Sequence, residues 1–135
     1  MDLIKITPDK ERARNIVSMT SLIENRIKLQ NHDRTKMSAL MVADYYEIIK
    51  ELITALMFTD GYKTLSHKDL IEYLSENYKE FNGKEISLLD DLRVLRNRIS
   101  YDGFNIDKTY LDRNEENFKK IITKLSVIIH KKLSK

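Results

Sequence analysis

The chain contains only three glycines and one proline in 135 residues, and this scarcity of turn-forming residues limits the folds open to it. A β-rich domain needs a turn roughly every ten residues, and glycine and proline supply many of those turns. Apolar side chains recur instead at intervals of three and four residues, which is the spacing of one face of an α-helix. The sequence therefore predicts an all-α protein, an up-and-down bundle of about five helices.

Length and composition narrow the class further. A chain of 135 residues can bury a real core, and we expect residues 1–135 to form a single domain. It contains no cysteine, which excludes disulfides and thiolate chemistry, and its net charge of +3 is only mildly basic. No apolar run approaches the roughly 20 residues of a membrane span, and the first residues lack the apolar segment of a signal peptide. We therefore expect a cytoplasmic protein with no membrane contact.

Cap and turn residues mark the expected ends of the first two helices. Pro8 suits the first position of a helix, with Thr7 as the N-cap, so the first helix is expected to start there. Asn31-His32-Asp33 is expected to end this helix. A second helix is expected from about Lys36 to Phe58, and Gly61 is placed to cap its end. This is the most apolar helix, so we expect it at the centre of the bundle. Its predicted buried stripe consists of Met37, Leu40, Met41, Tyr45, Ile48, Ile49, Leu52, Ile53, Leu56 and Met57.

Three more helices are predicted in the second half of the chain. Ser66 and Asp69 have the spacing of a capping box, so a third helix is expected to open at Ser66. Asn82-Gly83 predicts a turn, and a fourth helix is expected from near Ser87 to around Tyr101. A fifth helix is expected over roughly Lys108 to Leu133. Its predicted inward face consists of Phe118, Ile121, Ile122, Leu125, Ile128 and Ile129.

The sequence lacks the usual signatures of metal sites and of several enzyme classes. His32, His67 and His130 lie on different predicted elements, without the spacing of metal ligands. We interpret His67 as a helix-start residue that follows Ser66. There is no glycine-rich phosphate loop, no nucleophile elbow and no paired-carboxylate motif. We therefore expect neither a metal nor a cofactor.

The fourth predicted helix differs from the others in how its arginines are placed. Each residue advances about 100° around an α-helix, so four apolar residues cluster within an arc of roughly 60° on one side of Arg96. These are Leu88, Leu92, Leu95 and Ile99. Arg93, Asn97, Ser100 and Tyr101 occupy the adjoining arc, so Arg96 lies at the edge of the buried stripe. A partly desolvated guanidinium held by packing is well suited to bind an anion, and we expect Arg93, Arg96, Asn97 and Ser100 to bind a ligand.

An ordinary structural role for the same arginines is also open. Arg93 has Asp90 three residues before it, a spacing that allows an ion pair on the helix surface. Arg96 could extend over the core and bond to a neighbouring carboxylate. Composition and spacing alone favour this interpretation.

Two segments of the sequence match the pattern of a known family. The first is LRVLRNRISYDGF, residues 92–104. The second starts with ADYY at residues 43–46 and ends with GYKTLSH at residues 61–67. Both resemble segments of the HEPN superfamily (higher eukaryotes and prokaryotes nucleotide-binding). With the fifth predicted helix included, the resemblance covers most of the chain. It implies a helical bundle that commonly forms a homodimer.

The resemblance also carries functional expectations. Many HEPN proteins are metal-independent ribonucleases, often toxins paired with a minimal nucleotidyltransferase. Their motif is an arginine, a polar residue, three or more variable residues and a histidine, and Arg96 and Asn97 match its first two positions. In that chemistry the arginine polarises the scissile phosphate of RNA, and the histidine exchanges protons with the attacking 2′-hydroxyl.

Tyr101 stands at the position of the family histidine, and Gly103 stands where toxin members have a tyrosine. An ordinary phenol has a pKa of about 10 against about 6.5 for imidazole, so it is a poor general base near neutral pH. We therefore expect a HEPN-like protein that binds RNA, a nucleotide or a protein partner in a cleft around Arg96, without catalysis. Two alternatives stay open. One is a ribonuclease toxin that uses Arg96, Asn97 and Tyr101, and the other is a structural partner of a separate nucleotidyltransferase chain.

Overall fold

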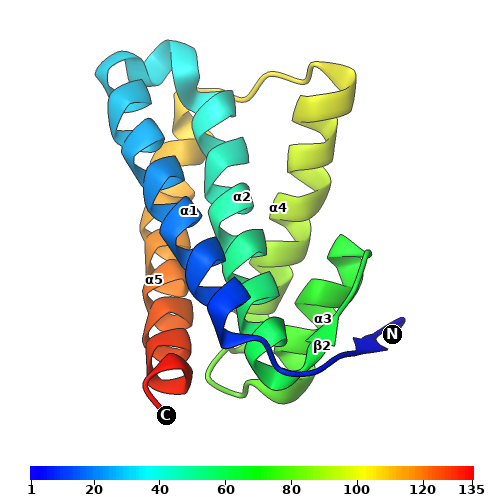
Figure 1. Cartoon of the computed structure of the whole chain (residues 1–135). Helices are drawn as coiled ribbons and strands as arrows, with labels where there is room; N and C mark the ends of the chain where they lie inside the picture. The colour runs from blue at the N-terminus through cyan, green and yellow to red at the C-terminus, as the bar shows by residue number, and fades with distance from the viewer.

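Five α-helices and one pair of very short strands make up the structure, a computed structural model that describes residues 1–135. The helices are α1 (Lys10–Gln30), α2 (Arg34–Asp60), α3 (His67–Asn77), α4 (Gly83–Asp102) and α5 (Lys108–Leu133). A 3₁₀ turn, Asn31–Asp33, joins α1 to α2, and the non-helical backbone of Asp33 (φ −131°, ψ 60°) confirms the predicted break between the first two helices. Figure 1 shows α2 in the middle, with α1 and α5 on one side of it and α3 and α4 on the other. The predicted all-α class is confirmed.

The core is one cluster of buried side chains built around α2. This helix packs against all four of the others, and 14 of its 27 residues are buried, which confirms its predicted central place. Leu40 is the exception within the predicted stripe, because its side chain is half exposed. The predicted inward face of α5 is confirmed, with Phe118, Ile121, Leu125 and Ile129 fully buried. No helix has the length and apolarity needed to cross a membrane.

Several helix ends lie where the cap residues predict them. Gly61 ends α2 in the left-handed conformation, with φ +86°. The Ser66 hydroxyl accepts a hydrogen bond from the backbone N–H of Asp69, which starts α3. The predicted bounds of α5 are those observed. In each case a short-range signal, a cap or a change in periodicity, decides the boundary.

Two predicted helix starts are wrong. We expected α1 to start at Pro8, but it starts at Lys10, because the carboxylate of Asp9 accepts the backbone N–H of Arg12 at 3.0 Å. We expected α4 near Ser87, but it starts at Gly83. Asn82 and Glu85 form a reciprocal capping box there, in which each side chain accepts the backbone N–H of the other. What looked like a turn is therefore the cap of a longer helix.

The N-terminal strap, residues 2–9, crosses the ends of α2 and α3 and was not predicted. Its strand β1 (Ile4–Lys5) pairs antiparallel with β2 (Tyr62–Lys63), the segment between α2 and α3. Three of its backbone N–H groups donate to this region: Asp2 to the Asp69 carboxylate, Ile6 to the Gly61 carbonyl and Asp9 to the Phe58 carbonyl. The strap therefore ties the start of α3 to the end of α2.

Gly61 and Gly83 provide a matched pair of stability tests. A Cβ at Gly61 would lie 3.0 Å from the Ile6 carbonyl oxygen, and φ +86° disfavours any L side chain, whereas a Cβ at Gly83 meets nothing within 4 Å. We expect Gly61→Ala to lower the free energy of unfolding by more than about 1 kcal/mol. Gly83→Ala should raise it by about 0.4–1 kcal/mol. Urea denaturation measures both, and equal effects of the two substitutions would contradict this account.

Candidate functional site

Arg93 and Arg96 lie at the edge of the buried face of α4, as the helical spacing predicts. Their side chains are 20% and 23% exposed, respectively. Arg93 donates to Asp90, with Nε–Oδ1 at 3.0 Å. Arg96 approaches Glu47 on α2, with Nη2–Oε2 at 3.7 Å, and makes no hydrogen bond. Both arginines therefore have the carboxylate neighbours that a structural role predicts, but the contact of Arg96 is loose.

The other residues predicted for this face do not join the two arginines. Asn97 is half-buried and Ser100 is exposed, and neither side chain makes a hydrogen bond within the protein. Tyr101 is 79% exposed in the last turn of α4, which ends at Asp102. The phenol has no hydrogen-bond partner, so nothing orients it towards Arg96.

His67, the first residue of α3, lies near the two arginines instead. Its ring packs on the ring of Tyr46, with centroids 6.0 Å apart. Arg93 and Arg96 act electrostatically on both His67 and Tyr46. Three helices therefore contribute to one group of side chains, which we term the α2–α3–α4 cluster. It consists of Tyr46, Glu47, Lys50, His67, Arg93 and Arg96.

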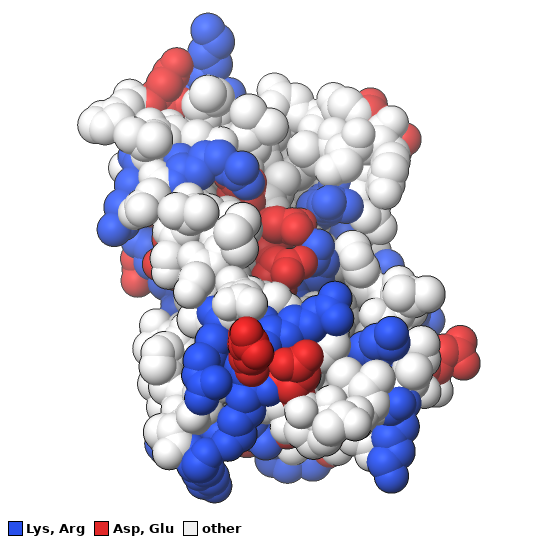
Figure 2. Space-filling view, viewed as in Figure 1, with Lys and Arg blue, Asp and Glu red and all other residues white.

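The cations of the cluster differ in how well they are paired. The Lys50 ammonium contacts Glu47 at 2.6 Å and Glu51 at 3.0 Å. Glu47 is thus already engaged by Lys50 when it meets Arg96 at the longer distance of 3.7 Å. In the middle of the face that Figure 2 shows, acidic and basic side chains lie side by side. Within the cluster, Arg96 is the cation whose charge is least neutralised by a neighbouring carboxylate.

Other arginines show what a structural ion pair looks like in this protein. Arg26 on α1 donates through Nε and Nη2 to both carboxylate oxygens of Asp44, at 2.9 and 2.7 Å. Arg34 donates to Asn31 and Asp112, at 3.0 and 2.8 Å. Arg96 makes none of these bonds although it is partly buried. Its planar array of N–H donors is therefore free to bind a carboxylate or phosphate, which match it in geometry.

The environment of the cluster shifts two pKa values. Burial lowers the pKa of His67, and the charges of Lys50 and Arg96 lower it further. Burial raises the pKa of Tyr46 to about 12, against the opposing effect of Arg93 and Arg96. At neutral pH both rings are uncharged, so His67 offers one donor and one acceptor nitrogen beside two guanidinium groups.

Sequence reasoning assigned His67 to a helix start and did not place it in the site. That assignment is correct, because Ser66 caps α3, but it is incomplete. Lys50 and Glu47 carried a weak signal, since they are three residues apart on the central helix. No spacing within one helix could reveal that α3 packs against α4.

No group of three or more His, Asp or Glu side chains is arranged to hold a metal ion. A scan against protein-family models and searches of curated proteins and of solved structures found no match for this chain.

The position of His67 beside Arg96 can be tested by titration. We expect NMR to give His67 a pKa below its ordinary 6.5, and Arg96→Gln to move that pKa upwards by removing a nearby positive charge. Arg98→Gln is the matched control, since Arg98 stacks on Phe104 at 3.8 Å and does not act on His67. Equal effects of the two substitutions would contradict the arrangement.

The lowered pKa of His67 also predicts a pH dependence of stability. Below pH 6.5 the unfolded state binds a proton at His67 that the folded state does not, so stability rises with pH in this window. The contribution is full above pH 6.5 and is lost as the pH falls through the folded pKa. Urea denaturation of the wild type and His67→Gln between pH 7.5 and about 5 measures this difference. A wild-type advantage that grows on acidification would contradict it.

Proposed function

We propose that this chain is a HEPN-like protein that binds a phosphate-bearing ligand, RNA or a nucleotide, at Arg96 without cleaving it. The observation that carries the proposal is the pairing of Arg96. Its guanidinium is 23% exposed, makes no hydrogen bond, and has only a 3.7 Å contact with a carboxylate that Lys50 already binds. The resemblance of residues 92–104 to the HEPN motif supplies the class of ligand.

A phosphate can bind here at little cost to the rest of the cluster. An oxyanion that displaces Glu47 from Arg96 leaves the Glu47–Lys50 contact intact at 2.6 Å. Arg96 then forms two parallel N–H···O bonds to the phosphate, and Arg93 adds a second positive charge one turn away. The neutral imidazole of His67 offers a further donor. These contacts suit one phosphate group and its ester oxygens.

The position of Tyr101 supports binding without catalysis. A general acid or base must lie within hydrogen-bond reach of the proton that it transfers. The side chain of Tyr101 is 79% exposed, and no neighbouring side chain fixes the phenol. The tyrosine at the position of the family histidine therefore lacks the placement that proton transfer requires.

A metal-independent ribonuclease is the second candidate, and His67 is the observation that favours it. A neutral imidazole beside Arg93 and Arg96 resembles the residue set of the ribonuclease motif, although it comes from another helix. In this version His67 rather than Tyr101 takes the proton from the attacking 2′-hydroxyl.

Ligand binding at Arg96 is tested by fluorescence anisotropy with a labelled single-stranded RNA and with a labelled nucleotide. We expect Arg96→Ala to weaken binding by about tenfold to a hundredfold, the effect of losing a charge-assisted hydrogen bond pair. Arg98→Ala removes the same charge from the same helix on the side that faces Phe104, so it is the matched control. Affinity that ignores Arg96→Ala would remove the proposed site.

The same RNA, recovered after incubation with EDTA, decides between binding and cleavage. We expect it to be intact. If it is cleaved, the proposal of binding without catalysis is wrong, and two variants identify the proton-transfer group. Loss of cleavage in His67→Ala but not in Tyr101→Phe assigns it to His67, and the reverse result assigns it to Tyr101.

We propose further that two copies of the chain associate through one exposed face of α1 and α2. Met19, Leu22 and Leu29 are each more than half exposed and lie on the same side of α1 as Arg26. The Arg26–Asp44 ion pair joins this side to α2, where Leu40 is exposed one turn before Asp44. Glu47 follows one turn after Asp44, so the apolar face is continuous with the cluster.

Association is measured by light scattering after size-exclusion chromatography. We expect a dimer that Leu22→Asp together with Leu29→Asp converts to a monomer, since charges in an apolar interface are strongly unfavourable. Leu65→Asp is the control, because Leu65 is fully exposed on the connection before α3. A wild-type monomer at all concentrations would contradict this arrangement, and a monomer that binds a minimal nucleotidyltransferase through the same leucines would assign the face to that protein instead.

A further inference from the structure

Positive charge is concentrated at the C-terminal end of the chain. Residues 117–135 contain six lysines and neither aspartate nor glutamate, so the other 116 residues carry 18 basic and 21 acidic side chains. The net charge of +3 therefore hides a strongly basic segment on a mildly acidic body. Such asymmetry is typical of a surface that meets a polyanion. Figure 2 shows basic side chains gathered at lower left, over the ends of α1 and α5.

Two lysines of this segment, Lys119 and Lys131, lie on one wall of a furrow on the opposite side of α2 from the cluster. We call it the α1–α5 furrow, and its volume is about 880 Å³. Met41 and Tyr45 of α2 form its floor, because α1 and α5 both pack on α2 but leave space between each other. Lys28 of α1 and Lys119 and Lys131 of α5 lie along its two walls.

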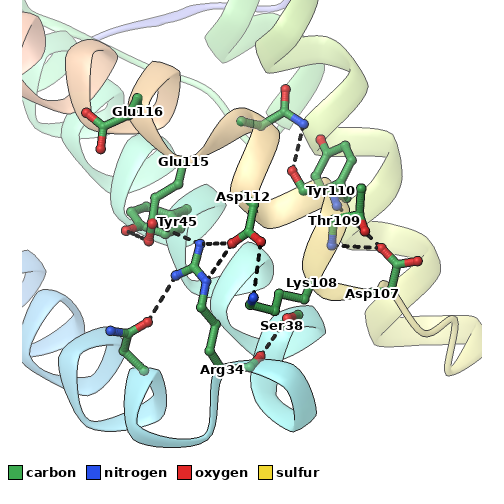
Figure 3. A network of polar contacts seen from close by, with 12 residues as sticks. Arg34, Ser38, Tyr45, Asp107, Lys108, Thr109, Tyr110, Asp112, Glu115 and Glu116 are labelled. Atoms are coloured by element: carbon green, nitrogen blue, oxygen red, sulfur yellow. Dashed lines mark hydrogen bonds and ion pairs between the residues drawn. The ribbon is translucent and has the colours of Figure 1, made fainter.

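Hydrogen bonds and ion pairs at both ends of the furrow fix the distance between its two walls. At one end, Lys10 and Arg14 of α1 donate to the carbonyl oxygens of Lys135 and Leu133. At the other end, Arg34 at the start of α2 bonds both to Asn31, which directly follows α1, and to Asp112 and Glu115 of α5 (Figure 3). The furrow is therefore open in the folded chain before any ligand binds.

The charges that face the furrow are mainly unpaired cations. Lys28 and Lys131 make no ion pair, and Lys119 reaches only the exposed Glu116, at 3.8 Å. Glu115 adds little opposing charge, because Arg34 at 3.0 Å and the Tyr45 hydroxyl at 2.6 Å already bind its carboxylate. Burial disfavours that carboxylate, yet these two bonds lower its pKa. Glu24 is the remaining acid of the lining.

We propose that the α1–α5 furrow binds single-stranded RNA. Lys119 and Lys131 are about 18 Å apart along α5. A stacked strand places a phosphate about every 3.4 Å, so the lysines of the two walls can each meet a different phosphate. Asn31, Thr123 and Ser126 line the same furrow and can bond to 2′-hydroxyl groups. The exposed apolar surface of Val127 offers contact to base faces.

Other polyanions fit the furrow less well. An anionic membrane needs an apolar helix face to insert, but Phe118, Ile121, Leu125 and Ile129 are fully buried in the core. A nucleic-acid duplex is wider than the space between two neighbouring helices, whereas a positively charged groove that follows one strand is a common site for single strands. The furrow residues lie on other faces than Arg96, so this inference goes beyond the ligand proposed for the cluster.

The test uses anisotropy of a labelled single-stranded RNA of about a dozen nucleotides, a length in the range that such grooves bind. The variant is Lys28→Gln, Lys119→Gln and Lys131→Gln together. For a single strand, log affinity falls with log salt concentration by about 0.7 for each phosphate neutralised. We expect the triple variant to bind at least tenfold more weakly at low salt, and its salt slope to decrease by about 2.

A control variant, Lys68→Gln, Lys79→Gln and Lys84→Gln, has the same net charge and changes exposed lysines outside the furrow. Equal losses in the two triple variants would overturn the furrow, because net charge alone would then explain them. Unchanged affinity of the furrow variant would also overturn it.

If only Arg96→Ala weakens RNA binding, the cluster holds the RNA and the furrow does not. If only the furrow variant weakens RNA binding, the furrow holds the RNA and the cluster does not. Equal binding of poly-glutamate, or binding of anionic vesicles but not of RNA, would assign the furrow to another partner.

Discussion

The packing of α2 among the four other helices is the constraint on which the rest of the structure depends. A helix that packs against four others can place few polar side chains, and each of them must find a partner. Asp44 meets Arg26, and Glu47 and Lys50 meet each other. Adjacent residues consequently serve opposite sides of the molecule: Tyr45 forms part of the furrow floor, and Tyr46 packs on His67 in the cluster.

Arginines in this protein fall into two groups that burial alone does not separate. Arg34 and Arg96 are 20% and 23% exposed, respectively, so packing restricts them to a similar degree. Arg34 is held by Asn31, Asp112 and Glu115, and these bonds join α2 to α5. Arg96 has one loose contact. A partly buried guanidinium whose donors are unsatisfied lowers the stability of the folded protein. A residue with a purely structural role would have better hydrogen bonds, as Arg34 has. This difference is the physical reason for the proposal that Arg96 binds a ligand.

The fold was largely predictable because its signals are local. Periodicity and caps give both ends of α2 and α5 and the start of α3 to within about two residues. The errors have the same local origin: Asn82-Gly83 was taken as a turn although Glu85 completes a capping box, and Asp9 rather than Thr7 caps α1. Leu40 fits the apolar period of α2 but is half exposed.

The site was only half predictable, for a geometric reason. Angles around one helix place Arg96 at the edge of the buried face, and the structure agrees. They also place Tyr101 near Arg96, but α4 ends one residue later and no neighbouring helix covers the phenol. His67 enters the site through the packing of α3 on α4 and through β1–β2 pairing, which joins segments about 60 residues apart along the chain. Contacts of that range depend on the whole fold.

The N-terminal strap gives the cluster a different mechanical character from the furrow. A two-residue ladder to the segment before α3 and one hydrogen bond from Asp2 to Asp69 hold the start of α3, whereas the furrow walls are long helices anchored in the core. Local opening of the strap costs far less than unfolding of the core. Each molecule with a detached strap has His67 free to move away from Arg96, so the apparent affinity of the cluster is the intrinsic affinity multiplied by the attached fraction. Temperature, denaturant at low concentration or a substitution in residues 2–9 would thus regulate binding at Arg96 from a distance, while the α1–α5 furrow kept its shape.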